Sequence, residues 1–304
     1  MKQPHQIIVI VGPTAIGKTK LAIELACHYR CNIISADSRQ FYKEMTIGTA
    51  VPDEEELSAA PHFLIQHKSI HENYTVGDFE REALTLIDEF SAKTNKTIVV
   101  GGSGLYINAL LYGLDEFPQV PEVIRTELNE MVKDRGIQWL QSELNRVDPD
   151  YYSQVDSRNP QRMIRALEIY RASGLTFSSL RRAKTKQRPF SFQIIGLTAP
   201  RPIIYERINL RVDKMLEEGL IDEAKRLWPH KKLNALNTVG YKELFNFFEH
   251  KIDLVQATEL IKQNTRRFSK RQMTWFKKNR DIKWLAYDNA LEESIRYIQT
   301  TNQF

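Results

Sequence analysis

The feature that most constrains this fold is a glycine-rich segment near the start of the chain, at residues 12–19. Its sequence, GPTAIGKT, fits the pattern G-x4-G-K-T. A short apolar and β-branched run at residues 6–11 precedes it, and residues 18–28 follow with apolar side chains at helical spacing. A strand, a glycine loop and a helix in this order form a phosphate-binding P-loop, because the N–H groups of the loop converge on phosphate oxygens.

The P-loop supplies neutral hydrogen-bond donors, its backbone N–H groups, together with one positively charged side chain. The Lys18 ammonium adds a positive charge, and the Thr19 hydroxyl is the expected ligand of Mg²⁺. The glycines allow the backbone to curl closely around a phosphate group. We expect phosphate to be bound by Gly12, Pro13, Thr14, Ala15, Ile16, Gly17, Lys18 and Thr19.

Strand and helix patterns alternate in the first and last parts of the chain. Apolar, β-branched runs predict strands, and apolar residues at helical spacing predict the helices between them. This alternation indicates an α/β fold with a P-loop NTPase-like parallel sheet flanked by helices. The predicted strands are residues 6–11, 32–36, 97–100 and 192–197, and the predicted helices are residues 18–28, 78–93, 105–111, 202–218 and 253–278.

The middle of the chain has a different pattern. Residues 118–189 contain charged helical segments separated by polar breaks, without the pattern of a buried strand. We therefore predict a mostly helical insertion domain at residues 118–189 within a P-loop core domain formed by residues 1–117 and 190–304.

Three further groups of residues are candidates for the crevice at the carboxyl ends of the strands. Asp37 follows the second predicted strand and is a candidate base, Mg²⁺ ligand or helix cap. Ser103 lies in a glycine cluster after the third strand, where close helix packing explains the glycines equally well. Arg207 and Arg211 share one helix face, and they either neutralise phosphate or are solvated.

The net charge of +5 is unevenly distributed along the chain. Residues 156–190 carry a net charge of +7, residues 262–283 carry +8, and the remainder carries −10. An acidic body with two basic segments suggests a polyanionic partner, whereas two solvated helix faces are the alternative. A basic helix at residues 161–168 and a basic loop at residues 181–188 suit a folded RNA backbone.

The predicted helix at residues 253–278 combines an apolar face with a basic face. Its apolar face includes Ala257, Ile261, Phe268 and Trp275. The opposite face carries Arg266, Arg267, Lys270 and Arg271.

Cysteine content and hydropathy argue against several other classes of protein. The two cysteines, Cys27 and Cys31, favour neither a disulfide framework nor a structural zinc site. No segment approaches the roughly 18 apolar residues that span a bilayer, and the apolar run at residues 7–11 is too short for a signal peptide. We expect a cytoplasmic monomer without a membrane partner.

Taken together, the motifs of this sequence resemble those of the tRNA dimethylallyltransferase family over nearly the whole chain. Several motifs in the family's order are far more specific than a P-loop alone. The departures are small: Ile16 replaces a small residue, Ser103 replaces a commoner threonine, and Phe63 replaces a frequent histidine. The matching segments are residues 12–19, 37–42, 48–50, 61–62, 100–106, 161–168, 239–243 and 270–275.

The resemblance implies transfer of the dimethylallyl group of dimethylallyl pyrophosphate to the exocyclic amine of the adenosine 3′ of the anticodon in tRNA. Pyrophosphate would leave from the P-loop with Mg²⁺, Ser103 and Arg211, and Asp37 would be the base. The target base would have to leave its stack to reach the crevice. The resemblance places contacts with the anticodon stem-loop at Ser38, Arg39, Gln40, Gln161, Arg162, Met163, Ile164 and Arg165.

Two other functions would use part of the same sequence. A P-loop kinase for a nucleoside or small metabolite would use the same loop, but its substrate would require neither basic segment. A non-catalytic RNA-binding protein would leave Lys18, Thr19 and Asp37 without a chemical role. Product analysis with ATP and with prenyl pyrophosphate separates the kinase from the prenyltransferase.

Overall fold

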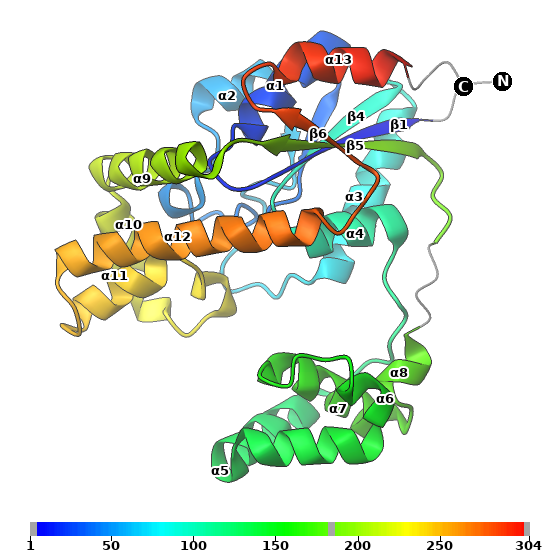
Figure 1. Ribbon diagram of the computed structural model, residues 1–304, viewed down its shortest axis with the longest axis vertical. Helices are drawn as coiled ribbons and strands as arrows, with labels where there is room; N and C mark the ends of the chain where they lie inside the picture. Colours follow the sequence, from blue (N-terminus) through cyan, green and yellow to red (C-terminus); the bar gives the residue numbers. More distant parts are fainter. Residues whose placement is uncertain (1–4, 182–185, 301–304) are drawn as a thin grey trace. The chain divides into compact units, whose positions relative to one another are not determined.

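The computed structural model describes residues 5–181 and 186–300 (Figure 1). Arg182 and Lys184 of the predicted basic loop lie outside the described residues. The chain divides into two compact units, which we call the core unit (residues 1–111 and 187–304) and the inserted unit (residues 112–186).

The core unit contains a six-stranded parallel sheet in the described part of the chain, with the strand order β3-β2-β4-β1-β5-β6. The predicted α/β fold with a parallel sheet is therefore confirmed. The strands are β1 (Gln6–Val11), β2 (Asn32–Ser35), β3 (His62–Phe63), β4 (Lys96–Val100), β5 (Ser191–Thr198) and β6 (Ile282–Ala286).

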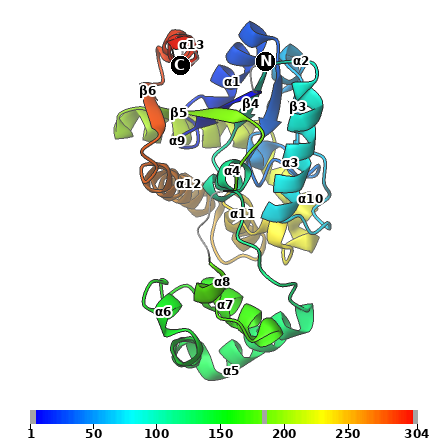
Figure 2. The same ribbon diagram turned by 90° about the vertical axis from the view of Figure 1, so that its right-hand side faces the viewer.

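Helices flank this sheet (Figures 1 and 2). Their bounds in the core unit are α1 (Lys18–Tyr29), α2 (Glu54–Ala59), α3 (Val76–Ser91), α4 (Gly104–Tyr112), α9 (Arg201–Glu217), α10 (Leu220–Leu227), α11 (Tyr241–Phe248), α12 (Leu254–Phe276) and α13 (Ala290–Thr300). Short 3-10 turns lie at η1 (Ile47–Thr49), η2 (Trp228–His230) and η3 (Asn234–Leu236).

The centre of the sheet is buried on both faces because β1 is apolar along almost its whole length and lies between β4 and β5. On one face, Ile8 and Ile10 pack in a cluster with the apolar stripes of α1 and α13 and the start of α9. A second cluster joins the end of α9 to α10, α11 and α12. These helices form a layer beyond the sheet edge, and they carry many of the residues that line the site below.

Three loops leave the carboxyl edge of the sheet side by side because β2, β4 and β1 are parallel neighbours. The Ala36 N–H donates to the Val100 carbonyl at 2.7 Å, and the Gly101 N–H donates to the Ile10 carbonyl at 3.2 Å. A Cβ on Gly101 would overlap the Ala36 carbonyl group, so this close approach requires glycine. The edge thus brings the P-loop, Asp37 and Ser103 together.

The regular secondary structure in the described residues of the inserted unit is helical. It consists of α5 (Glu122–Val147), α6 (Pro149–Tyr152), α7 (Pro160–Ser173) and α8 (Phe177–Leu180). The α5 helix is broken at Gly136, whose φ of 77° lies in the left-handed region. The unit has an apolar core of its own, formed mainly by α5 and α7.

Several elements escaped the sequence analysis. The two-residue strand β3 is too short to produce a periodic signal, and the alternation in β6 is lost at its last three residues, which are all apolar. Among the described residues, no helix has the length and apolar character that crossing a membrane requires.

Candidate active site

A cavity of about 710 Å³ opens at the carboxyl edge of the sheet. Its lining comes from the P-loop, the segment after β2, the turn at residues 48–50, the glycine cluster after β4, and helices α9 and α12. All of these elements belong to the core unit. The cavity is therefore built where strand ends of a parallel sheet place ligands.

The P-loop has the curled backbone that phosphate binding requires. Gly12 and Gly17 have φ values of 144° and 103°, which favour glycine strongly. Gly17 is also the N-cap of α1, so the positive end of the helix dipole lies at the loop. Thr14, Lys18 and Thr19 line the cavity.

The surroundings of Lys18 destabilise the charged form of its ammonium group. Its Nζ donates to the Pro13 carbonyl at 2.8 Å. Burial lowers the pKa of Lys18 to about 8, Asp37 raises it in part, and Arg211 lowers it further. Burial, with the Arg207 charge beside it, also lowers the pKa of Arg211. An incoming anion would relieve this repulsion, so the site favours an anionic ligand.

The two arginines of α9 have different positions. Arg211 lines the cavity, whereas Arg207 supports the P-loop from outside it. The Arg207 Nε donates to the Ala15 carbonyl at 2.7 Å, and its guanidinium lies over the Tyr287 ring at 5.3 Å. Of the pair, Arg211 is therefore the one available to a ligand.

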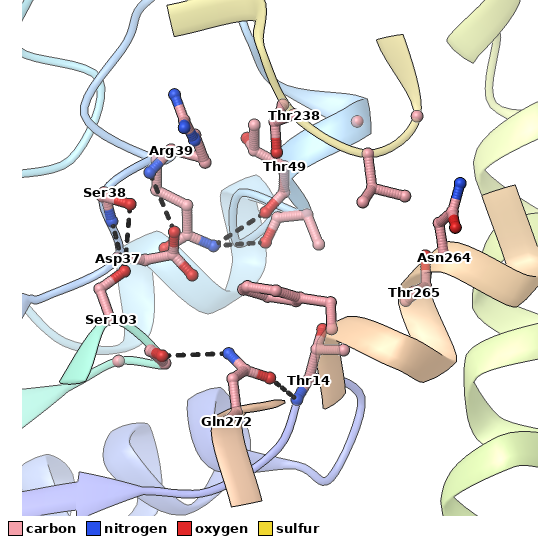
Figure 3. Close-up of a pocket in the computed structure, with 18 of the residues that line it drawn as sticks. Thr14, Asp37, Ser38, Arg39, Thr49, Ser103, Thr238, Asn264, Thr265 and Gln272 are labelled. Atoms are coloured by element: carbon pink, nitrogen blue, oxygen red, sulfur yellow. Dashed lines mark hydrogen bonds between the residues drawn. The ribbon is translucent and has the colours of Figure 1, made fainter. Parts of the chain in front are cut away.

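Asp37 and Ser103 come from neighbouring loops and are linked through Ser38 (Figure 3). The Asp37 Oδ1 accepts the Arg39 N–H at 3.0 Å, which fixes the carboxylate over its own loop. The Ser103 Oγ accepts the Ser38 N–H at 3.0 Å and donates to the Ser38 Oγ at 3.1 Å. Asp37 lines the cavity, so its second carboxylate oxygen can accept a hydrogen bond from a ligand.

The predicted RNA contacts Arg39 and Gln40 are bonded within the core unit. The Arg39 guanidinium donates to the carbonyls of Asn234 and Ala235 at 3.1 and 2.9 Å. The Gln40 amide donates to the carbonyls of Thr49 and Ala50 at 3.2 and 2.8 Å. These bonds tie the segment after β2 to η3 and to the turn at residues 48–50.

The turn at residues 46–48 is held by a buried carboxylate that the sequence analysis missed. The Glu223 Oε2 accepts the N–H groups of Thr46 and Ile47 at 3.0 and 2.8 Å. Its Oε1 accepts the Gly48 N–H at 2.9 Å and the Tyr241 hydroxyl at 2.7 Å. The position of Tyr241 in a matched motif was a signal, but Glu223 lies in an ordinary helix pattern.

The α12 helix contributes both to the core and to the cavity. Ala257 and Ile261 are buried, whereas Phe268 and Trp275 are 39% and 38% exposed and line the cavity. The helix turns them toward the site because residues three, four and seven apart share one face.

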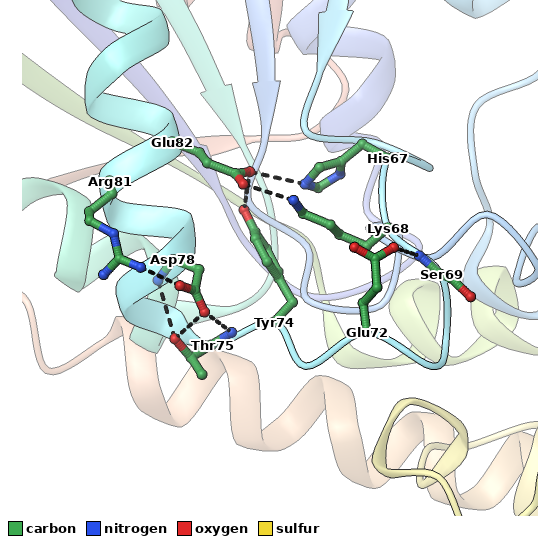
Figure 4. Close-up of polar contacts among 9 residues, drawn as sticks. All are labelled: His67, Lys68, Ser69, Glu72, Tyr74, Thr75, Asp78, Arg81 and Glu82. Atoms are coloured by element: carbon green, nitrogen blue, oxygen red, sulfur yellow. Dashed lines mark hydrogen bonds and ion pairs between the residues drawn. The ribbon is translucent and has the colours of Figure 1, made fainter. Parts of the chain in front are cut away.

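An aromatic and polar cluster supports the wall that Tyr106 forms. The Phe41 ring is buried and contacts Tyr106 and Tyr74, with centroids 5.5 and 5.0 Å apart. The Glu82 carboxylate accepts from the Tyr74 hydroxyl and from Lys68 Nζ, each at 2.8 Å (Figure 4). A capping box of Thr75 and Asp78 begins α3 beside them. None of the cluster's polar groups in Figure 4 lines the cavity, so its role is support.

The predicted RNA contacts of the inserted unit divide into two sets. Gln161 and Arg162 are exposed at the start of α7, and Arg165 bonds the buried Glu168 at 2.5 Å. Met163 and Ile164 are buried in the core of this unit. The expectation of side-chain contacts with RNA is therefore corrected for these two residues, because their apolar side chains pack inward.

Comparison with known proteins identifies the family. The IPP transferase family matches residues 40–279. A tRNA dimethylallyltransferase of Christiangramia forsetii is 54% identical over 296 residues, which cover 97% of this chain and 98% of that protein. One of Flavobacterium johnsoniae is 53% identical over 298 residues, covering 96% of each chain. The chain belongs to the IPP transferase family.

Solved structures agree with this family membership. The tRNA isopentenylpyrophosphate transferase of Bacillus halodurans is 36% identical and has a TM-score of 0.72, covering 97% of this chain and 96% of its own. A eukaryotic dimethylallyltransferase acting on tRNA is 27% identical with a TM-score of 0.79, covering 99% of this chain and 79% of its own. The family that the motifs predicted is confirmed.

Proposed function

We propose that this chain transfers the dimethylallyl group of dimethylallyl pyrophosphate to the exocyclic amine of the adenosine 3′ of the anticodon in tRNA. The observation that carries the proposal is one cavity of about 710 Å³, in which a P-loop and the Asp37 carboxylate both line the wall. A leaving-group site and a base must share a cavity for such a transfer. The relatives above support the same reaction by their names.

The P-loop side of the cavity stabilises departing pyrophosphate. The allylic C–O bond breaks while negative charge builds on the pyrophosphate oxygens. Loop N–H groups, Lys18 and Arg211 lie at that side of the cavity and balance this charge. Ser103 lines the cavity at the neighbouring loop, and its hydroxyl would turn from the Ser38 Oγ to donate to a pyrophosphate oxygen.

The Asp37 side of the cavity handles the nucleophile. The exocyclic amine of adenosine is a poor nucleophile because its lone pair is delocalised into the ring. Asp37 accepts a hydrogen bond from the amine, orients it toward the allylic carbon, and takes its proton as the C–N bond forms. The base reaches the cavity only after leaving its stack in the anticodon loop.

The donor set around the P-loop fits Mg²⁺ held mainly by the substrate. Thr19 lines the cavity and would hold the ion together with pyrophosphate oxygens and water. Among the described residues, no cluster of three or more His, Cys, Asp or Glu forms a protein cage for a metal. When bound, the ion would neutralise charge on the leaving group.

Nucleoside analysis tests the proposed reaction directly. The protein is incubated with Mg²⁺, dimethylallyl pyrophosphate and unmodified tRNA, and the digested nucleosides are analysed by mass spectrometry. We expect prenylated adenosine together with an equal amount of pyrophosphate. A parallel incubation with ATP in place of the prenyl donor tests the kinase, and phosphate transfer without prenyl transfer would refute the proposal.

The lowered pKa of Lys18 predicts a pH dependence for binding of the prenyl donor. The ammonium with a pKa of about 8 is charged below that pH and neutral above it. Affinity for dimethylallyl pyrophosphate should therefore fall about tenfold between pH 7 and pH 9, because the charged fraction of Lys18 falls from about ten-elevenths to about one-eleventh. Calorimetric titration at both pH values measures the change.

The Lys18→Ala variant is the control for this pH dependence. It lacks the titrating group, whereas ionisation of the ligand affects both proteins equally. The ratio of wild-type to variant affinity should fall between pH 7 and pH 9. A constant ratio would show that Lys18 does not titrate in this range.

Arg162 is the described residue of α7 best placed to contact RNA. It is exposed, and its backbone N–H is fixed by the Asn159 side chain at 3.3 Å. Arg162→Ala should make the slope of log affinity for tRNA against log salt shallower by roughly 0.7–0.9, the contribution of one phosphate contact. Filter binding at several salt concentrations measures this slope.

Arg146→Ala is the matched control. Arg146 is an exposed arginine of the same unit, but it is paired with Glu143 at 2.7 and 3.1 Å. Its replacement should leave the slope unchanged. Equal slopes for the wild type, Arg162→Ala and Arg146→Ala would show that Arg162 does not contact a phosphate of the RNA.

A further inference from the structure

The motif at residues 270–275 has no role in the chemistry described so far, yet its residues reach into the active site from α12. Trp275 packs against the glycine cluster after β4, where a Cβ on Gly104 would overlap its indole nitrogen. Gln272 lies one turn earlier, is 5% exposed and lines the same cavity. A buried polar side chain in this position must have its hydrogen bonds satisfied.

Gln272 makes its two hydrogen bonds to two different catalytic loops (Figure 3). Its Oε1 accepts the Thr14 N–H of the P-loop at 2.8 Å. Its Nε2 donates to the Gly102 carbonyl, next to Ser103, at 3.1 Å. One amide therefore spans the gap between the loop after β1 and the loop after β4.

This span coincides with the axis of the reaction. The P-loop holds the leaving group, and the loop of Ser103 completes that site and also contacts Ser38, the neighbour of Asp37, which orients the amine. Carbon transfer requires the amine, the allylic carbon and the leaving oxygen to keep a fixed spacing, and a shift of about 1 Å can cost roughly 10²-fold in rate. Whatever fixes the separation of the two loops controls that spacing.

We propose that Gln272 is a positioning residue, which acts as a strut setting the distance between the pyrophosphate loop and the loop that carries Ser103. The strut rests on the proposed prenyl transfer. It touches neither the leaving group nor the amine, and it works through the backbones of Thr14 and Gly102.

The glycine at position 102 is part of the same device. A Cβ on Gly102 would overlap the Gln272 amide nitrogen, so the donor can approach the carbonyl only beside glycine. Gly102→Ala should therefore displace the side-chain amide of Gln272 and break the strut, although residue 272 itself is not substituted. Two independent substitutions then probe one contact.

Single-turnover kinetics with saturating donor and enzyme test the strut. Gln272→Met keeps the length and volume of the side chain but removes both hydrogen bonds. The rate of prenyl transfer should fall roughly 10- to 100-fold, while the dissociation constants for dimethylallyl pyrophosphate and tRNA stay within threefold. Thr274→Ala, an exposed neighbour on the same helix, should match the wild type.

The double variant makes the test specific. Gly102→Ala and Gln272→Met remove the same contact, so the double variant should be no slower than the slower single variant by more than about threefold. If the rate reduction in the double variant equals the product of the two single reductions, the strut is overturned. It is also overturned if the variants bind the substrates more weakly but transfer the prenyl group at the wild-type rate. If Gln272→Met fails to fold, Gly102→Ala carries the same rate test.

The outcomes separate this inference from the proposed function. If the wild-type protein transfers the prenyl group and the folded Gln272→Met and Gly102→Ala variants transfer it at the same rate, the strut is overturned and the proposed function stands. Absence of prenyl transfer by the wild-type protein would overturn the proposed function, and the strut with it.

Discussion

Replacing Asp37 with asparagine lowers the single-turnover rate of prenyl transfer by about 10²–10⁴-fold, the usual contribution of a general base. The substitution is nearly isosteric. The amide oxygen of the variant side chain can still accept the Arg39 N–H that Asp37 accepts at 3.0 Å, so the loop keeps its shape. What disappears is the ability to take the proton of the amine. Rapid-quench assays with enzyme in excess of tRNA measure the rate.

Binding measurements separate this loss of chemistry from a loss of affinity. The dissociation constants for tRNA and dimethylallyl pyrophosphate should stay within about threefold of wild type. Asp53→Asn is the matched control, because the Asp53 carboxylate also accepts a backbone N–H but lies outside the cavity at the start of α2. A single-turnover rate within threefold of wild type would exclude Asp37 as the base.

The second large effect belongs to Lys18. Lys18→Ala should lower the single-turnover rate by about 10²–10³-fold, comparable with removal of one donor that stabilises developing negative charge. It should also weaken binding of dimethylallyl pyrophosphate, because the P-loop then holds the phosphates by N–H groups alone. The same rapid-quench assay, run at several donor concentrations, measures both quantities.

Lys20→Ala controls for a general loss of positive charge near the P-loop. Lys20 is two residues further along α1, has an 80% exposed side chain, and lies 3.9 Å from Glu24. Its removal should leave both rate and affinity unchanged. Normal transfer by Lys18→Ala would mean that the leaving group binds elsewhere.

The parts of the fold that sequence predicted well are those with a strong local signal. The β1 strand, the P-loop and α1 depend on an apolar run, two glycines and a helical stripe that are close together in the chain. The order of the motifs likewise predicted the family correctly. These features depend on local chemistry, which a single sequence records.

The parts that sequence missed depend on contacts between distant residues. Gln272 is 258 positions from Thr14, and Glu223 is 175 positions from Gly48. Neither residue type nor spacing indicates such a partner. The sequence also does not show where the apolar face of α12 lies, because Phe268 and Trp275 are apolar whether they fill a core or line a cavity. Hydrophobic periodicity shows which face of a helix is apolar, but it does not show what that face contacts.

The strand order has a consequence for synthesis of the chain on the ribosome. The β1 strand lies between β4 and β5, but residues 112–186 are made before β5. At 5–20 residues per second, this delay lasts roughly 4 to 15 seconds. The inserted unit is continuous in sequence and has its own core, so it can fold during this time. The edge of β1 that later pairs with β5 meanwhile stays unpaired. The nascent core unit is therefore exposed to aggregation during this time.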